Sequence, residues 1–123
     1  MRFSYTILFV SDMQRSLAFY QLLGLKVKMQ SPFWSELETG GTTLALHLAA
    51  DGAPPLAPVA EGAIPAGHAH TGFEVDDVDA FAARMKEAGA AILRDVRTED
   101  FGGRMGVWQD PDGIPVSVMS RPH

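Results

Sequence analysis

The sequence contains an internal repeat, which constrains the possible folds more than any other feature. A shift of 65 positions superposes Asp12 on Asp77 and Gly24 on Gly89. In each half the aspartate follows a strand-like run and can cap the N-terminus of a helix, while the glycine stands where helices commonly end in left-handed backbone. A strand, a helix start and a helix end rarely coincide by chance, so we expect two copies of one supersecondary unit.

Each repeat is predicted to have the order βαβββ. The helices carry apolar residues at spacings of three and four, and the strand-like runs are rich in β-branched and aromatic residues. The first repeat is predicted to form strands over residues 3–10, 25–29, 33–38 and 42–49 with a helix over 13–23; the second is predicted to form a strand over 70–75, a helix over 78–88 and three strands between residues 91 and 121, one of them over 103–108.

Length and composition favour a single α+β domain. The chain has 123 residues, 46% of them hydrophobic and 20% charged, which is typical of a globular protein with one core. We expect repeat one over residues 1–50, a connector rich in Pro, Ala and Gly over 51–67, and repeat two over 68–121. A net charge of −5 argues against nucleic acid or an anionic membrane as partner. The N-terminal run lacks a signal-peptide core, so a cytoplasmic location is expected.

The repeats are predicted to pair, because a single unit cannot bury a sheet face alone. We expect the helices outside and two curved mixed sheets facing each other across a central cup. In the run at 43–48, alternation turns Leu44 and Leu46 toward the helix, and therefore turns Ala45 and His47 toward the cup. The same parity places Ser117 and Met119 in the cup from the second repeat. Tyr5 and His70 occupy equivalent positions on the two first strands and are expected to face the same cavity.

Six short motifs carry a resemblance to a known family. They are VSD at 10–12, SLAFY at 16–20, LGL at 23–25, FEVDD at 73–77, AGA at 88–90 and DPDG at 110–113. In these motifs the chain resembles the glyoxalase, bleomycin-resistance and extradiol dioxygenase group, also called the vicinal oxygen chelate (VOC) superfamily. The resemblance implies the glyoxalase/bleomycin resistance/dioxygenase fold. It does not select a reaction, because this scaffold hosts lyases, epimerases, dioxygenases, thiol transferases and drug-binding proteins without catalytic activity.

The resemblance also implies four positions for a divalent metal. They fall on Tyr5, Ala45, His70 and Ser117. Only His70 is an ordinary ligand, since alanine has no donor atom, serine is a weak neutral donor and tyrosine must ionise far below its usual pKa of about 10 to bind strongly. His47 lies on the same strand face as Ala45, so His47 and His70 could still hold a weakly bound metal. His47 is otherwise expected to line the ligand pocket or to lie in the core.

Other side chains complete the candidate site. His68 and His70 form an H-x-H pair, interpreted either as a two-histidine chelate or as an exposed pair at the mouth of the strand. Trp34 and Trp108 lie in predicted strands, where an indole facing the cup would stack on a planar ligand and an indole facing the helix would be core. The candidate ligand-binding residues are Tyr5, Trp34, Ala45, His47, His70, Trp108 and Ser117, and the candidate metal ligands are His47 and His70.

Two functions follow from these residues. The first is a protein that binds a small hydrophobic or aromatic molecule in the cup, with a degraded metal site and no cofactor. The alternative is a metal-dependent enzyme of lyase, isomerase or dioxygenase type with an altered ligand set. In either case we expect a homodimer, because the short chain leaves sheet edges that a second copy can cover. The connector permits two arrangements of such a dimer, one in which the subunits exchange halves and one in which they do not.

Overall fold

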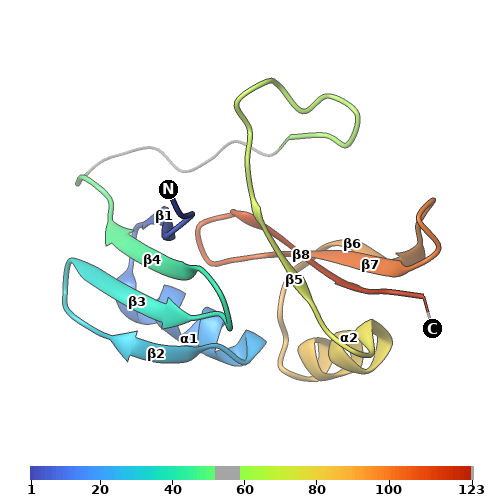
Figure 1. The fold of residues 1–123 in the computed structure, drawn as a ribbon, viewed down its shortest axis with the longest axis horizontal. Coiled ribbons are helices and arrows are strands. Elements are labelled where there is room, and N and C mark those ends of the chain that lie inside the picture. The colour runs from blue at the N-terminus through green and yellow to red at the C-terminus, as the bar shows by residue number, and fades with distance from the viewer. Residues whose placement is uncertain (52–58, 123) are drawn as a thin grey trace. The chain divides into compact units, whose positions relative to one another are not determined.

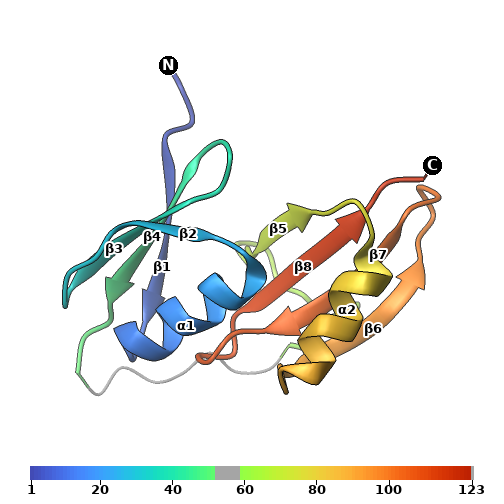
Figure 2. The same ribbon diagram turned by 90° about the horizontal axis from the view of Figure 1, so that it is seen from below.

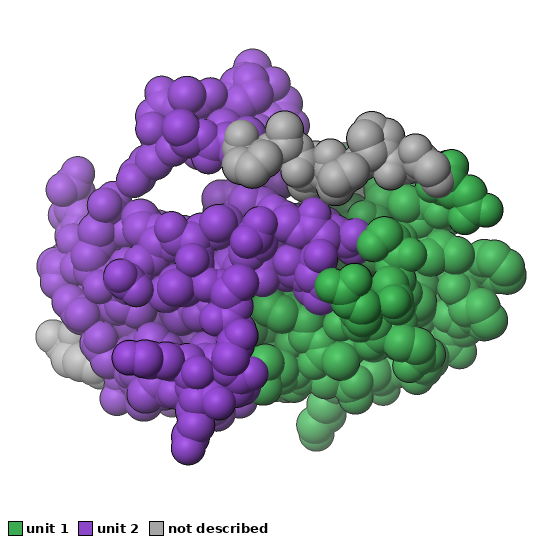
Figure 3. Space-filling view, turned by 180° about the vertical axis from the view of Figure 1, so that it is seen from behind, with its two compact units in different colours: residues 1–55 green, residues 56–123 purple. Residues whose placement is uncertain are grey.

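The structure, a computed structural model, describes residues 1–51 and 59–122 (Figure 1). The chain divides into two compact units, residues 1–55 and 56–123, which Figure 3 colours separately. The division falls inside the predicted connector 51–67, of which residues 52–58 lie outside the described part of the chain. No helix in the described ranges is long and apolar enough to cross a membrane.

The first unit has the predicted order βαβββ. Its elements are β1 (Tyr5–Val10), α1 (Met13–Leu23), β2 (Lys26–Met29), β3 (Trp34–Glu38) and β4 (Thr43–Leu48). They form a four-stranded mixed sheet in the order β1-β4-β3-β2, in which β1 and β4 are parallel and the other neighbours are antiparallel. The last strand of the unit therefore lies inside the sheet, next to the first.

Helix α1 begins and ends where the sequence predicts. The Asp12 side chain accepts a hydrogen bond of 3.1 Å from the backbone N–H of Arg15, which satisfies one of the free donors at the helix start. Gly24 ends the helix at φ 112°, in the left-handed region that favours glycine. The helix contacts β2 and β4, and it lies against one face of the sheet (Figures 1 and 2). Leu17 and Tyr20 are buried on its sheet-facing side.

The second unit repeats this architecture. Its elements are β5 (Thr71–Glu74), α2 (Val78–Glu87), β6 (Ile92–Thr98), β7 (Arg104–Gln109) and β8 (Pro115–Ser120). The sheet order is β5-β8-β7-β6, with β5 and β8 parallel, so each strand has the same place as its counterpart in the first unit. The two four-stranded sheets confirm the predicted tandem βαβββ fold.

The core of the second unit lies between α2 and its sheet. The Trp108 ring meets the Phe81 ring edge-on, with centroids 5.1 Å apart. Val116 and Val118 on β8 are buried beside them. At the rim of this layer, Arg104 on β7 donates two hydrogen bonds, of 2.8 and 2.9 Å, to the carboxylate of Asp79 on α2. These two parallel hydrogen bonds connect the sheet to the helix through residues that are 25 positions apart in the sequence.

Several predicted strands are shorter in the structure. The first strand begins at Tyr5 rather than at residue 3, and β5 begins at Thr71, so His70 precedes the strand on which it was expected. In the first case the register explains the difference: β4 begins at Thr43, the partner of Tyr5, so Phe3 has no strand to pair with. The bounds of a strand depend on where its neighbouring strand begins and ends. Tertiary pairing therefore sets these bounds, and local composition alone does not.

Candidate functional site

The register of the first sheet sorts its side chains onto two faces. Leu44 and Leu46 on β4 and Leu37 on β3 are buried against the helix. Alternation turns the residues between them to the opposite face, here called the helix-free face. Three cross-strand rows can be followed on it: Tyr5 beside Thr43, then Ile7, Ala45 and Glu36, then Phe9, His47 and Trp34.

The third row forms an aromatic cluster, defined by Phe9, Trp34 and His47. The His47 ring centroid lies 5.2 Å from that of Phe9, with the planes tilted by 41°, and 6.0 Å from that of Trp34, with the planes nearly perpendicular. The Phe9 side chain is 60% exposed and Trp34 is half-buried. Aromatic side chains that stand exposed together on a sheet face are suited to stacking against a planar molecule.

One nitrogen of the His47 ring is held by the backbone. Nδ1 donates to the carbonyl oxygen of Leu48 at 2.7 Å, so that in the neutral ring Nε2 is the acceptor. His47 therefore adds one hydrogen-bond acceptor to an otherwise apolar cluster. A ligand that stacks here can donate a single N–H or O–H to it.

The middle row lies next to the aromatic cluster, and its central residue is buried. Ala45 is 0% exposed between its register neighbours Ile7 and Glu36. The Trp34 indole N–H donates to Oε2 of Glu36 at 3.0 Å, which fixes the plane of the indole beside this row. The row thus supplies a fixed orientation for one aromatic side chain.

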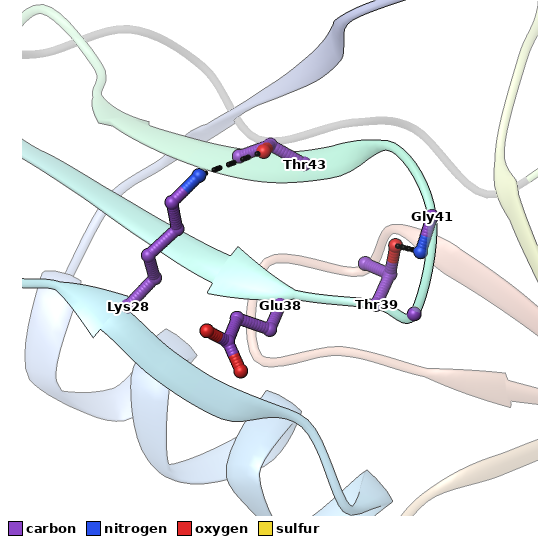
Figure 4. Close-up of a pocket in the computed structure, with 6 residues that line it drawn as sticks. Lys28, Glu38, Thr39, Gly41 and Thr43 are labelled. Atoms are coloured by element: carbon purple, nitrogen blue, oxygen red, sulfur yellow. Dashed lines mark hydrogen bonds between the residues drawn. The ribbon is translucent and has the colours of Figure 1, made fainter.

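The first row borders a polar pocket of about 260 Å³, lined by Lys28, Glu38, Thr39, Gly40, Gly41 and Thr43. Figure 4 shows the Lys28 side chain reaching from β2 across β3 toward β4, where Nζ lies 3.5 Å from Oγ1 of Thr43. The same ammonium lies 3.8 Å from Oε1 of Glu36. A register shift between Val27 and Met29 places Lys28 in a β-bulge, and bulges commonly redirect a side chain in this way.

In the second unit the predicted residues are more scattered. Ser117 on β8 is buried, and its hydroxyl donates to the carbonyl oxygen of Thr71 at 3.4 Å. His70 is exposed just before β5, with its ring 5.9 Å from that of His68. Partial burial, and secondarily the charge of His68, lower the pKa of His70 below 6.5. His70 is therefore neutral at pH 7, and its ring nitrogens can serve as one donor and one acceptor.

The two tryptophans have different environments. Trp34 lies on the helix-free face of the first sheet, in the aromatic cluster. Trp108 is 1% exposed and packs on Phe81 of α2. Its indole belongs to the core of the second unit, out of reach of a ligand on the helix-free side of its own sheet. Of the two roles that the sequence left open for this indole, Trp108 has the core role.

The donor set does not fit the divalent metal that the resemblance implies. Of the four implied positions, Ala45 has no donor and is buried, and the Ser117 hydroxyl is turned to a backbone carbonyl. Tyr5 and His70 remain, of which only the imidazole binds a divalent ion well without ionising. Among the described residues, no three His, Asp or Glu side chains lie close enough together to hold an ion.

Sequence reasoning missed part of this site. Phe9 was assigned only to a strand, although it is two residues from Ile7 and four from Tyr5 and so shares their face. That alternation was a usable signal. The sequence gives no such signal for the contact of Lys28 with β4. Strand alternation cannot predict where the Lys28 side chain points, because the bulge interrupts the register between Val27 and Met29. Glu36 and Glu38 are two residues apart on β3, so the same alternation places them on one face.

Comparison with known proteins places the chain in a family. The Glyoxalase/Bleomycin resistance protein/Dioxygenase superfamily matches residues 2–118. A metallothiol transferase FosB from Shouchella clausii (strain KSM-K16) is 34% identical over 120 residues, which cover 89% of this chain and 73% of that protein. Among solved structures, a glyoxalase/dioxygenase from Nostoc punctiforme has a TM-score of 0.79 at 23% identity, covering 99% of this chain and 92% of that one. The structure of SMU.1112c has a TM-score of 0.77 at 26% identity, covering 97% and 98%.

Proposed function

The chain belongs to the glyoxalase/bleomycin resistance protein/dioxygenase superfamily, and we propose that within it the protein binds a small hydrophobic or aromatic molecule on the helix-free face of its first sheet. The observation that carries the proposal is the aromatic cluster of Phe9, Trp34 and His47, with its exposed Phe9 ring. Stacking rings match a planar ligand, and the His47 acceptor gives it one polar contact.

The exposed aromatic side chains of β1 support binding by area burial. Tyr5 is 56% exposed at the other end of β1 from Phe9, with Ile7 between them on the same face. Each aromatic side chain can cover a large area of a ligand, and removal of apolar surface from water is worth about 25 cal/mol per Å². The central cup predicted between the two repeats stays a prediction.

The alternative function is a metal-dependent enzyme of lyase, isomerase or dioxygenase type. It would require His47 and His70 to hold the ion with water, because the other implied positions offer no strong donor. The relative from Shouchella clausii is a metallothiol transferase by name, yet the ligand set of this chain at the implied positions contains one imidazole. The donor chemistry therefore favours binding over metal catalysis.

A homodimer is proposed for the assembled protein. In the first unit β1 is an edge strand, and Phe3, Tyr5 and Phe9 on or next to it are exposed. Unpaired edges with apolar side chains favour association with a second copy. Exchange of halves between the subunits and assembly without exchange are both compatible with this proposal.

The binding proposal is tested with a neutral naphthalene probe, N-acetyl-dansylcadaverine, titrated by fluorescence. We expect saturable binding with a blue-shifted emission, and at least a fivefold weaker affinity in Trp34→Ala because the indole supplies the stacking surface. Phe101→Ala is the matched control, since Phe101 is an exposed aromatic outside the cluster. An equal effect of the two substitutions, or no binding by the wild type, would refute the proposal.

A further inference from the structure

We infer that the polar pocket binds a protonated amine carried by the same ligand, with the Glu38 carboxylate as its acceptor. The inference rests on the proposed function, because the pocket lies on the helix-free face that carries the aromatic cluster. Thr43 lines the pocket and His47 belongs to the cluster, and both project from β4 on the same face. One molecule can therefore contact both ends of the face.

The charges around the pocket favour a cation. Lys28, the one basic residue lining it, is already paired with Oε1 of Glu36 at 3.8 Å and hydrogen-bonded to Thr43. The other oxygen of Glu36 accepts from the Trp34 indole. Glu38 also lines the pocket, and within the described residues its carboxylate has neither a hydrogen bond nor an ion pair. The charge left without a partner is negative.

The remaining polar groups of the pocket do not compete for this carboxylate. The Thr39 hydroxyl is bonded to the carbonyl oxygen of Thr42, and its oxygen accepts from the backbone N–H of Gly41 at 3.3 Å (Figure 4). Lys26 is the register neighbour of Glu38 on β2, but both are exposed and their charged groups lie too far apart for an ion pair. An anion would have to displace Glu36 from Lys28 beside a second carboxylate, which is unfavourable.

The spacing along β4 defines the ligand further. Thr43 and His47 are four positions apart on β4, which corresponds to about 13 Å at roughly 3.3 Å per residue. The ligand class is thus an aromatic molecule with an amine on an extended chain, rather than a compact aromatic amine.

Two dansyl probes that differ only at one end test this inference. Dansylcadaverine carries a primary ammonium on a pentyl chain, and N-acetyl-dansylcadaverine replaces the ammonium with a neutral amide. Both are titrated against the wild type, Glu38→Gln, Trp34→Ala and Glu87→Gln. Glu87 ends α2 and is exposed, so Glu87→Gln removes the same charge at a distance in sequence from the site and controls for net charge.

We expect dansylcadaverine to bind the wild type about three- to fivefold more tightly than the acetylated probe, as for a partly exposed ion pair, and this difference should shrink with added salt. Glu38→Gln should abolish the difference, and Glu87→Gln should keep it. If the probes bind the wild type equally, or if both glutamine variants act alike, the inference fails while Trp34→Ala still reports on the aromatic cluster. If neither probe binds the wild type, the proposed function fails and the inference falls with it.

Discussion

Glu36 joins the two ends of the helix-free face through its two carboxylate oxygens. One oxygen accepts from the Trp34 indole at 3.0 Å and the other lies 3.8 Å from the Lys28 ammonium. These contacts are partly exposed, and such contacts contribute little to folding. Their effect is to hold two side chains in the positions that a ligand meets.

Replacing Glu36 should therefore affect binding more than folding. We expect Glu36→Ala to weaken N-acetyl-dansylcadaverine binding about threefold, because the freed indole samples other rotamers. The free energy of unfolding should fall by less than ~1 kcal/mol. A fluorescence titration and urea denaturation of the same variant measure the two effects. A large loss of stability with unchanged binding would contradict this role.

His70 provides a prediction about pH. Partial burial and the neighbouring His68 lower its pKa in the folded protein, so the unfolded chain binds more protons near the ordinary value of 6.5. Folding stability should accordingly fall as the pH drops from 6.5 through the lowered pKa of His70. An NMR titration of the imidazole Hε1 signals should show His70 titrating below 6.5, and His68→Ala should move the pKa part of the way back. A pKa above 6.5 would contradict the assigned cause.

At the scale of elements, the tight turn between β7 and β8 depends on one buried carboxylate. Oδ1 of Asp110 accepts hydrogen bonds of 2.8 Å from the backbone N–H groups of Asp112 and Ile114. Gly113 completes the turn at φ 84°, in the left-handed region. The proline and glycine of the motif at 110–113 are residue types that favour such a turn.

Loss of the Asp110 carboxylate should destabilise the second unit. We expect Asp110→Ala to lower the free energy of unfolding by about 2 to 3 kcal/mol, because two backbone donors lose a charged acceptor at a buried position. Urea denaturation measures the change, with the exposed Asp100→Ala as control for charge. Equal stability of the two variants would show that water replaces the carboxylate.

The elements also show how far sequence reasoning reaches. Both helix N-caps and both terminal glycines follow from local chemistry, and the structure confirms them: Asp12 and Asp77 cap the helices, and Gly24 and Gly89 have positive φ. The faces of Trp34 and Trp108 do not follow from local chemistry. A one-residue shift of register exchanges the two faces of a strand, and the bulges in β2 and β6 shift the register.

For the whole molecule, the donor set predicts little bound metal. We expect untagged protein, purified without chelators, to carry far less than one equivalent of zinc, manganese, nickel or iron by elemental analysis. His70→Ala should leave that content and the affinity for N-acetyl-dansylcadaverine unchanged. Stoichiometric metal that is lost in His70→Ala would instead establish the alternative function, with His70 as a ligand.

The assembly proposal gives a second prediction at this scale. Light scattering after size-exclusion chromatography at micromolar concentration should report twice the 13.3 kDa mass of the chain. Replacing Phe3, which is exposed just before the edge strand β1, with Lys should shift the protein toward the monomer, because a charge there opposes pairing of apolar edges. A wild type that elutes as a monomer would contradict the proposal.

The parallel pairing within each unit has a consequence for synthesis on the ribosome. In the first unit β4 lies between β1 and β3, so β1 has no strand to pair with in its own sheet until residue 48 has left the exit tunnel. The same holds for β5 until β8 is complete at residue 120. These closures are long-range and slow compared with hairpin formation. The nascent chain therefore exposes the apolar strand β1 for the time that translation takes to reach β4, and a pause before that point prolongs the interval in which chaperones or other nascent chains can bind it.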